Sequence, residues 1–372
     1  MARTIVGVND PRAVKKWSGN LALDTSAKSY FNSRFMQRGA EAEVPVQILT
    51  ELESDAGEEI KYDLLAEMTM APIEGDDTLE GKEERQRFYT DSVYIDQARC
   101  GVNTGGRMTR KRTLHNLREK AKRQQSSWWA RLFDELLFIY GSGARGINPN
   151  FLVGTGYTGR ANNALVTPDA SHRLYGGDAT AFNNIDATDK LTLGKITDAL
   201  NRATVQGGGV SGIPVMQPCK IDGTEVFVCV MHTWQEDDLR KSTATGDWLD
   251  LQKAAAGSEG RNSPLFKKNL GMHRDVILHS HKNAIRFSDA GAGSNVEAAR
   301  ALFMGAQAMV VAFGSPGTNM RFDWNEEARD NNNQVVITSS AIFGCKKVTF
   351  TTEAGGAQDF GVMAIDTACA SR

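Results

Sequence analysis

The sequence predicts an α+β protein in which one long helix accompanies several strands. Stretches of alternating apolar and polar residues, the pattern of strands with one buried face, occur in both halves of the chain. Apolar residues three and four positions apart, the pattern of one helix face, recur from 114 to 140. Glycine is high at 36 residues and proline low at 9, which favours many turns and loops between these elements.

Residues 1–43 have the composition of an arm. They hold seven Lys/Arg against four Asp/Glu, with scattered aromatic residues and no long periodic pattern. We expect only short helical pieces here, around 11–18 and 26–37. The first residues, MARTIVGVNDPRAVKKW, contain no apolar core region and do not form a signal peptide.

Residues 44–100 form a long, acidic, strand-rich excursion. VPVQILTEL and EIKYDLLAEM alternate like strands, the polar tip APIEGDDTLEGKEERQ follows, and FYTDSVYIDQARCGV reads as the return strand. Fourteen Asp/Glu and four Lys/Arg lie between 51 and 91. Because such a hairpin has little apolar material of its own, we expect it to need another surface to lie on.

The long helix is the clearest element of the sequence. Its periodic pattern runs from 114 to 140 and stops at the GSG of 141–143, so it would span about 40 Å. Residues 107–123 are strongly basic, with eight Lys/Arg and one Glu, whereas the end of the helix is apolar. The predicted buried face consists of Leu114, Leu117, Ala121, Gln125, Trp128, Leu132, Leu136 and Ile139.

The second half of the chain mixes loops, helices and strands. Residues 144–190 read as an ordered loop rich in Gly, Asn, Thr and Asp. Residues 214–232 predict a β-hairpin whose tight turn is Asp222-Gly223. Two late strand tracts, QVVITSSAIFGCKKVTFT and DFGVMAIDTA, close the chain. The remaining predictions are helices at 191–206, 234–241 and 247–257, and a segment, 297–313, that begins as a helix and ends as a strand.

Three of the six histidines lie within GMHRDVILHSH, residues 271–281. Alternation places His279 and His281 on one strand face, which we expect to be half exposed, and Val276 and Leu278 on the other, buried face. With His273 these residues raise the hypothesis of a metalloenzyme. No acidic or cysteine partner stands at a recognisable spacing, and a zinc ion needs three or four protein ligands. A strand with a polar face is therefore the favoured interpretation.

Other catalytic signatures are weak or missing from the sequence. GTGYTG at 154–159 matches the dinucleotide fingerprint literally, but only FLV precedes it and no helical period follows. The P-loop, nucleophile-elbow and H-E-x-x-H motifs do not occur. Five cysteines without a CxxC pair indicate reduced thiols rather than a disulfide framework or zinc ribbon. The longest apolar tract, near 308–313, is far shorter than the roughly 18 residues of a membrane span. We therefore predict no enzyme activity, no cofactor, no metal site and no membrane partner.

Charge is divided between two segments, although the whole chain has a net charge of only −2. The acidic excursion and the basic helix start could each be a solvated face, and the basic segment alone could also bind phosphates. We favour a third interpretation, in which the acidic excursion of one copy lies on the basic helix of a neighbour and charge sets the register. The candidate residues are Asp76, Asp77, Glu80, Gly81, Glu83 and Glu84 in the excursion, and Arg110, Lys111, Arg112, Arg118, Lys122 and Arg123 in the basic segment.

This arrangement of arm, long hairpin, long helix and mixed body resembles the major capsid protein fold of tailed phages and herpesviruses. Individual blocks resemble major capsid proteins of the N4-like phage family. NDPRAVKKWSGNLALDTSAKSYF is similar to that family's N-terminal arm, and GDDTLEGKEERQRFYTDSVYIDQARCGV to its extended loop and return strand. NSPLFKKNLGMHRDVILHSHK and ARALFMGAQAMVVAFG are similar to its later body. The resemblance spans nearly the whole chain in order.

The resemblance implies a structural protein that assembles as pentamers and hexamers into an icosahedral head around double-stranded DNA. It implies scaffolding, portal and decoration proteins as partners, non-specific contact with packaged DNA, assembly in the cytoplasm of a bacterial host and a final place in the virion. An encapsulin-like compartment, which has the same fold and encloses enzymes, is the main alternative. The implied parts are an N-arm (1–43), an E-loop (44–100), a P-domain with the spine helix (101–190), an A-domain (191–317) and P-domain C-terminal strands (318–372).

Overall fold

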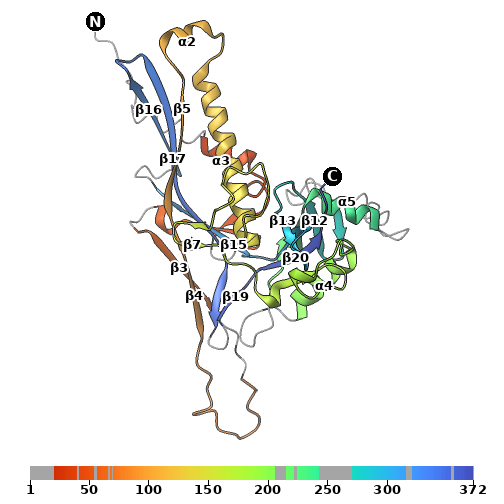
Figure 1. The fold of residues 1–372 in the computed structure, drawn as a ribbon. Coiled ribbons are helices and arrows are strands. Elements are labelled where there is room, and N and C mark those ends of the chain that lie inside the picture. The colour runs from red at the N-terminus through yellow and green to blue at the C-terminus, as the bar shows by residue number, and fades with distance from the viewer. Residues whose placement is uncertain are drawn as a thin grey trace.

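The computed structural model is elongated, with a long hairpin at one end and a helix-capped arm at the other (Figure 1). Strands outnumber helices, and two main sheets carry most of the core. The mixed α+β content agrees with the class predicted from the sequence patterns. The structure describes residues 21–39, 42–53, 57–65, 68, 70–205, 215–221, 224–242, 270–315, 321–352 and 356–371.

The first sheet is named here the β17 sheet after its longest strand. Its order is β1-β2-β15-β17-β16, and β5 pairs with Val336–Phe343 of β17, most of which also pair with β16. The β1–β2 and β2–β15 pairs are parallel, whereas β17 is antiparallel to all three of its neighbours. The sheet therefore joins the first third of the chain to its last part. Its strands are β1 (Met36–Arg38), β2 (Val46–Leu49), β5 (Asp96–Asn103), β15 (Met309–Gly314), β16 (Phe322–Arg329) and β17 (Gln334–Lys347).

The second sheet, named the β14 sheet, has the order β11-β12-β10-β14-β20-β8, with β9 on β10 and β13 on β14. Every residue of β20 is buried, as is nearly all of β14 and β10. Such strands lack alternation because both faces of the sheet are covered. The strands are β8 (Arg173–Tyr175), β9 (Cys219–Ile221), β10 (Thr224–Met231), β11 (Gly271–His273), β12 (Val276–Ser280), β13 (Arg286–Ala290), β14 (Val296–Met304) and β20 (Val362–Ala368).

Double-sided burial explains one wrong prediction. Residues 297–304 were expected to begin a helix, but they form strand β14 in the middle of the second sheet. The tract EAARALFM contains three alanines, a leucine and an arginine, all of which favour helices. β14 is a central strand that pairs with β10 on one edge and β20 on the other, and both of its faces are buried. The strand therefore does not show the alternation of polar and apolar residues that identifies a strand with one exposed face. The strand predicted for the end of this segment is confirmed as β15.

The long helix is confirmed, with a later start than predicted. Helix α3 (Leu117–Ser142) is about 39 Å long and begins at Asn116, whose side chain accepts a hydrogen bond from the backbone N–H of Glu119. It ends at the predicted glycine, since Gly143 has a φ of 68° and closes the helix in the left-handed conformation. The basic residues before it form a separate short helix, α2 (Arg107–Arg112). Leu114 lies between the two helices and is fully exposed.

Helix α3 packs against both sheets, so one continuous apolar core contains residues from all three. Most of the predicted face is buried, but Trp129 occupies the core position expected for Trp128. The indole of Trp129 packs edge-on to Phe322 at 5.3 Å between ring centres and donates a hydrogen bond to Ser339 Oγ at 2.9 Å. Its polar atom is therefore satisfied inside the core, as burial of an N–H requires.

A second core cluster lies on the opposite face of the β14 sheet. Helix α4 (Leu193–Val205) contributes Ile196, Ala199, Leu200 and Ala203, spaced as one helix face requires. This helix and α5 (Thr233–Ser242) confirm the predictions at 191–206 and 234–241. The hairpin predicted at 214–232 is confirmed as β9 and β10, while its turn at 222–223 and the helix predicted at 247–257 lie outside the described residues.

The acidic excursion is built on an antiparallel hairpin of β3 (Glu59–Leu65) and β4 (Phe88–Tyr94). Its base is anchored, because Ile60, Tyr89 and Val93 share an apolar cluster with Val348 and Phe350 of the adjoining segment. Beyond the paired strands, the chain between them projects away from the body (Figure 1). The second hairpin at the base consists of β18 (Thr349–Thr352) and β19 (Gly356–Asp359).

The N-terminal segment is part of the core from Leu21 onward. Residues 21–28 are helical, a turn follows, and β1 continues the segment, so the helix predicted at 26–37 is displaced. Leu21, Phe31 and Phe35 are fully buried. The helix expected at 11–18 lies outside the described part of the chain.

The loop predicted at 144–190 is confirmed apart from the short strand β8, and contains only small additional elements. GTGYTG lies in it with neither a preceding strand nor a following helix, so the geometry of a dinucleotide site is missing there. No helix in the described residues is long and apolar enough to cross a membrane. The remaining elements are η1 (Glu51–Glu53), β6 (Gly159–Arg160), β7 (Asn163–Ala164), η2 (Ala170–His172) and η3 (Phe182–Asn184).

Candidate functional site

The acidic candidate residues lie at the far end of the β3–β4 hairpin. Asp76, Asp77, Glu80, Gly81 and Glu83 are exposed, and Glu84 is half-buried. The local contacts are short-range: Asp77 pairs with Lys82 at 3.7 Å, and Glu84 pairs with Arg87 at 2.6 Å. Apolar side chains in and beside this loop are also exposed, among them Leu79, Met68 and Phe88. The loop is thus a charged surface with apolar residues that its own chain does not cover.

The basic candidate residues divide between two helices. Arg110, Lys111 and Arg112 end α2, whereas Arg118, Lys122 and Arg123 lie in the first two turns of α3. Three of them already have partners in the chain. Arg118 pairs with Glu326 at 2.7 Å, Lys122 pairs with Asp24 at 3.3 Å, and Arg110 donates a hydrogen bond to the carbonyl oxygen of Asn333 at 3.0 Å. Lys111, Arg112 and Arg123 are exposed. The basic surface is therefore interrupted at Thr113, where the backbone becomes extended.

The acidic and basic surfaces do not meet within one chain. The acidic loop projects from one end of the molecule, and α2 lies at the opposite end (Figure 1). A contact between them therefore needs two copies of the chain, with the acidic loop of one copy facing the basic surface of the other. Such head-to-tail contacts are heterologous and generate rings or larger assemblies.

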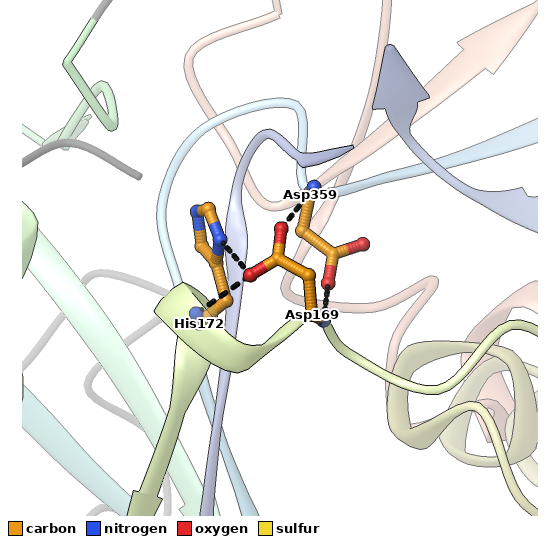
Figure 2. A group of neighbouring side chains, drawn as sticks. All are labelled: Asp169, His172 and Asp359. Atoms are coloured by element: carbon orange, nitrogen blue, oxygen red, sulfur yellow. Dashed lines mark hydrogen bonds and ion pairs between the residues drawn. The ribbon is translucent and has the colours of Figure 1, made fainter. Parts of the chain in front are cut away.

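A buried charge cluster lies where the two sheets approach each other, and the sequence patterns do not reveal it. Asp169 precedes η2, His172 ends it, and Asp359 ends β19; Figure 2 shows their side chains converging. Asp169 accepts hydrogen bonds from the backbone N–H and Nδ1 of His172 at 2.8 and 2.9 Å. The two aspartates also bind reciprocally: each carboxylate accepts the other's backbone N–H at 3.0 Å.

Lys347 completes this cluster. Its Nζ lies 2.5 Å from Asp359 Oδ1, and both side chains are buried, with 3% and 2% exposed. The donor atoms of Asp169, His172 and Asp359 lie within 4.8 Å of one another, as a metal site would need. Lys347 Nζ already occupies one side of the Asp359 carboxylate, so we assign no metal here. Burial alone would raise the pKa of Asp169. The hydrogen bond and charge of His172 outweigh this effect and hold the pKa of Asp169 below its usual range.

The histidines of 271–281 do not form one group. His273 Nε2 lies 3.0 Å from Thr197 Oγ1 on α4, on one side of the β14 sheet. His279 is fully buried and packs edge-on to Phe35 at 5.2 Å, and His281 stacks on Phe138 at 5.0 Å. The half-exposed face predicted for these two histidines is therefore wrong for His279, which the N-terminal segment covers, whereas His281, just beyond β12, is half-buried as predicted.

Asp134 of α3 anchors the N-terminal segment. Its carboxylate accepts hydrogen bonds from Ser29 Oγ at 2.7 Å and from the backbone N–H of Tyr30 and Phe31 at 2.8 and 3.2 Å. Burial raises the pKa of Asp134 to about 6, while the three hydrogen bonds oppose that shift. The anchor therefore contains a titrating group near neutral pH.

The raised pKa predicts a measurable pH dependence. An acid with a higher pKa in the folded state binds more protons there, so its stabilising effect is present below about pH 4 and is lost as pH rises through about 6. Between pH 7 and pH 4 we expect unassembled wild-type subunits to gain up to about 3 kcal/mol in unfolding free energy relative to Asp134→Asn. Urea unfolding at both pH values measures this difference. Exposed Asp289→Asn is the control, and parallel profiles for wild type and Asp134→Asn would contradict the assignment.

Comparison with known proteins gives consistent matches. Residues 5–371 match a family described as phage capsid protein. The chain is 26% identical over 358 residues to the major capsid protein of Pseudomonas phage KPP25, covering 87% of this chain and 88% of that protein. It is similar to the solved capsid of Ralstonia phage GP4, with 47% identity, a TM-score of 0.85 and coverage of 100% and 99% of the two chains. The capsid of cyanophage Pam1, at 19% identity, a TM-score of 0.70 and 93% coverage of each chain, shares the fold.

Proposed function

Because this chain belongs to the phage capsid protein family, we propose how its parts contribute to building a shell. The chain is a major capsid protein that self-associates into the icosahedral capsid of a virion, with a structural role and not an enzymatic one. The fold predicted from the sequence, that of tailed-phage capsid proteins, is confirmed. The observation that carries this conclusion is the likeness to the Ralstonia phage GP4 capsid along the whole chain.

We propose that the β3–β4 hairpin with its acidic loop acts as the E-loop and lies on the basic α2–α3 surface of a neighbouring copy. Opposite charges, exposed apolar residues in the loop and the separation of the two surfaces within one chain support this contact. In this proposal Asp76, Asp77, Glu80, Gly81, Glu83 and Glu84 face Arg110, Lys111, Arg112, Arg118, Lys122 and Arg123 of the neighbour.

The domain division predicted from the sequence becomes part of the same proposal. Residues 1–43 form the N-arm, 44–100 the E-loop, 101–190 and 318–372 the P-domain, and 191–317 the A-domain. The β14 sheet is then the body of the A-domain, and β8 and β20 enter it from the P-domain segments. Helix α3 is the spine that joins the two parts.

The finer affiliation and the partners are also proposals. Three sequence blocks support membership of the N4-like group: the segment from Asn9, the acidic loop with its return strand, and the segment from Asn262. We propose pentamers and hexamers as the assembly units, with scaffolding, portal and decoration proteins as partners. We also propose non-specific contact between the inner face and packaged double-stranded DNA.

Electron microscopy tests the function. When the chain is expressed with the other head proteins of its phage, negative-stain images should show closed shells. A stable monomer at high concentration in that context would contradict the proposal. An encapsulin-like compartment would instead enclose protein cargo, so the ratio of absorbance at 260 and 280 nm of particles from infected cells distinguishes the alternatives.

A further inference from the structure

Lys347 and Asp359 are held in a reactive geometry. Lys347 is the last residue of β17, and Asp359 is the last residue of β19. Asp359 pairs with Thr349 in the β18–β19 hairpin, and Thr349 is only two residues after Lys347 in the chain. The nitrogen and the carboxylate oxygen are 2.5 Å apart, which leaves the carboxyl carbon within reach of the nitrogen. In the described part of the chain, Lys347 Nζ makes this ion pair but no regular hydrogen bond. Reacting groups fixed at such short range gain much of the advantage of an intramolecular reaction.

Asp169 supports the carboxyl group from its other side. Its backbone N–H donates to Asp359 Oδ2 at 3.0 Å (Figure 2). The other carboxylate oxygen, Oδ1, is the one that Lys347 contacts. A fixed N–H at this position stabilises negative charge that develops on Oδ2 if the carboxyl carbon is attacked. The carboxylate of Asp169 accepts a hydrogen bond from the backbone N–H of Asp359 at 3.0 Å, so it fixes the backbone of Asp359 beside Lys347.

Burial also favours the protonation states that an amide-forming reaction requires. It lowers the pKa of Lys347 and raises the pKa of Asp359, so both shifts favour the neutral amine and the neutral acid over the ion pair. Water, which would reverse the reaction, has little access because both side chains are almost completely buried.

We propose that Lys347 and Asp359 condense into an isopeptide bond within one chain. Lys347 Nζ attacks Cγ of Asp359, a C–N bond forms, the C–OH bond breaks, and the hydroxyl leaves as water with a proton from the amine. One ammonium and one carboxylate give one neutral amide and one water, so no oxidant or other reactant is needed. The bond closes a ring around the β18–β19 hairpin, which packs against the base of the β3–β4 hairpin.

Mass spectrometry of the wild-type protein tests the proposal directly. The intact chain should be lighter than its sequence by one water molecule. Because trypsin cannot cleave after an acylated lysine, the last peptide should run from Lys347 to Arg372 and give no fragment ions between 347 and 359. A cyclic imide at Asp359 would also lose water, but would leave cleavage after Lys347 intact.

Two variants separate the bond from its surroundings. Lys347→Arg should restore the full mass, while Lys346→Arg, which changes the neighbouring lysine paired with Asp91, should keep the loss of water. Full mass with cleavage after Lys347 in wild-type protein, both as free subunits and in shells, would overturn the proposal and leave a simple ion pair. Micrographs of the same samples report shell formation independently, so this result is distinguishable from failure of the capsid function.

Discussion

Reversing the charge of the acidic loop is expected to abolish shell assembly while each subunit stays folded. The change is Asp76, Asp77, Glu80, Glu83 and Glu84 to Lys. These side chains are exposed or half-exposed, and the ion pairs of Asp77 with Lys82 and of Glu84 with Arg87 lie within the loop, so we expect the core to be unaffected. An exposed ion pair contributes only about 0.2–1 kcal/mol, but the reversal turns several attractions into repulsions at every copy of the contact. Small losses therefore add up over the whole shell.

Circular dichroism measures whether the subunit is folded, and negative-stain microscopy measures whether shells form. The subunit should keep its wild-type spectrum and melting temperature, and closed shells should be missing. The control is a compensating variant in which Lys111, Arg112 and Arg123 are changed to Glu in the same chain. Restored shells in the combined variant would tie the two surfaces together, whereas normal shells in the loop variant alone would refute the contact.

Replacing Arg300 is expected to produce the largest loss of subunit stability. Arg300 lies in β14 with 2% of its side chain exposed and donates to both carboxylate oxygens of Asp366 in β20, at 2.6 and 2.7 Å. It also donates to the carbonyl oxygen of Ser142 at the end of α3, at 2.6 Å. Arg300→Ala leaves Asp366 buried without this partner, which costs about 3–5 kcal/mol. The free energy of unfolding in urea measures the loss.

A double replacement distinguishes the pair from its packing. Arg300→Met with Asp366→Leu removes both charges together, so it should recover much of the stability lost in Arg300→Ala. A loss below about 1 kcal/mol for Arg300→Ala would mean that the guanidinium does not hold the spine helix and the β14 sheet together.

Local sequence patterns predicted the helices and strands that have one buried and one exposed face. The same patterns gave wrong predictions where both faces of a strand are buried. Helix α3 was predicted from its spacing, and its end at Gly143 from the glycine that the left-handed cap requires. The alternation of β17 and β5 was visible because their burial is partial. The burial of β14 and of His279 depends on neighbours distant in the chain. No local period reports such a neighbour.

The two candidate surfaces and the buried cluster show the same contrast. The acidic and basic segments are concentrated runs of charge, so the sequence reveals them without any structure. Asp169, His172, Lys347 and Asp359 have no informative spacing, and only the meeting of η2, β17 and β19 brings them together.

By itself the sequence determined the α+β class, the two opposed charged segments, the long helix and the resemblance to phage shell proteins. These features are encoded by residues near one another in the chain, where periodicity and charge density can be read directly. Only the tertiary structure decided that the charged surfaces lie at opposite ends, that the histidine strand is buried on both faces, and that Lys347 meets Asp359. The physical reason is that burial and contact depend on which distant strands pair, and that pairing is a property of the whole fold.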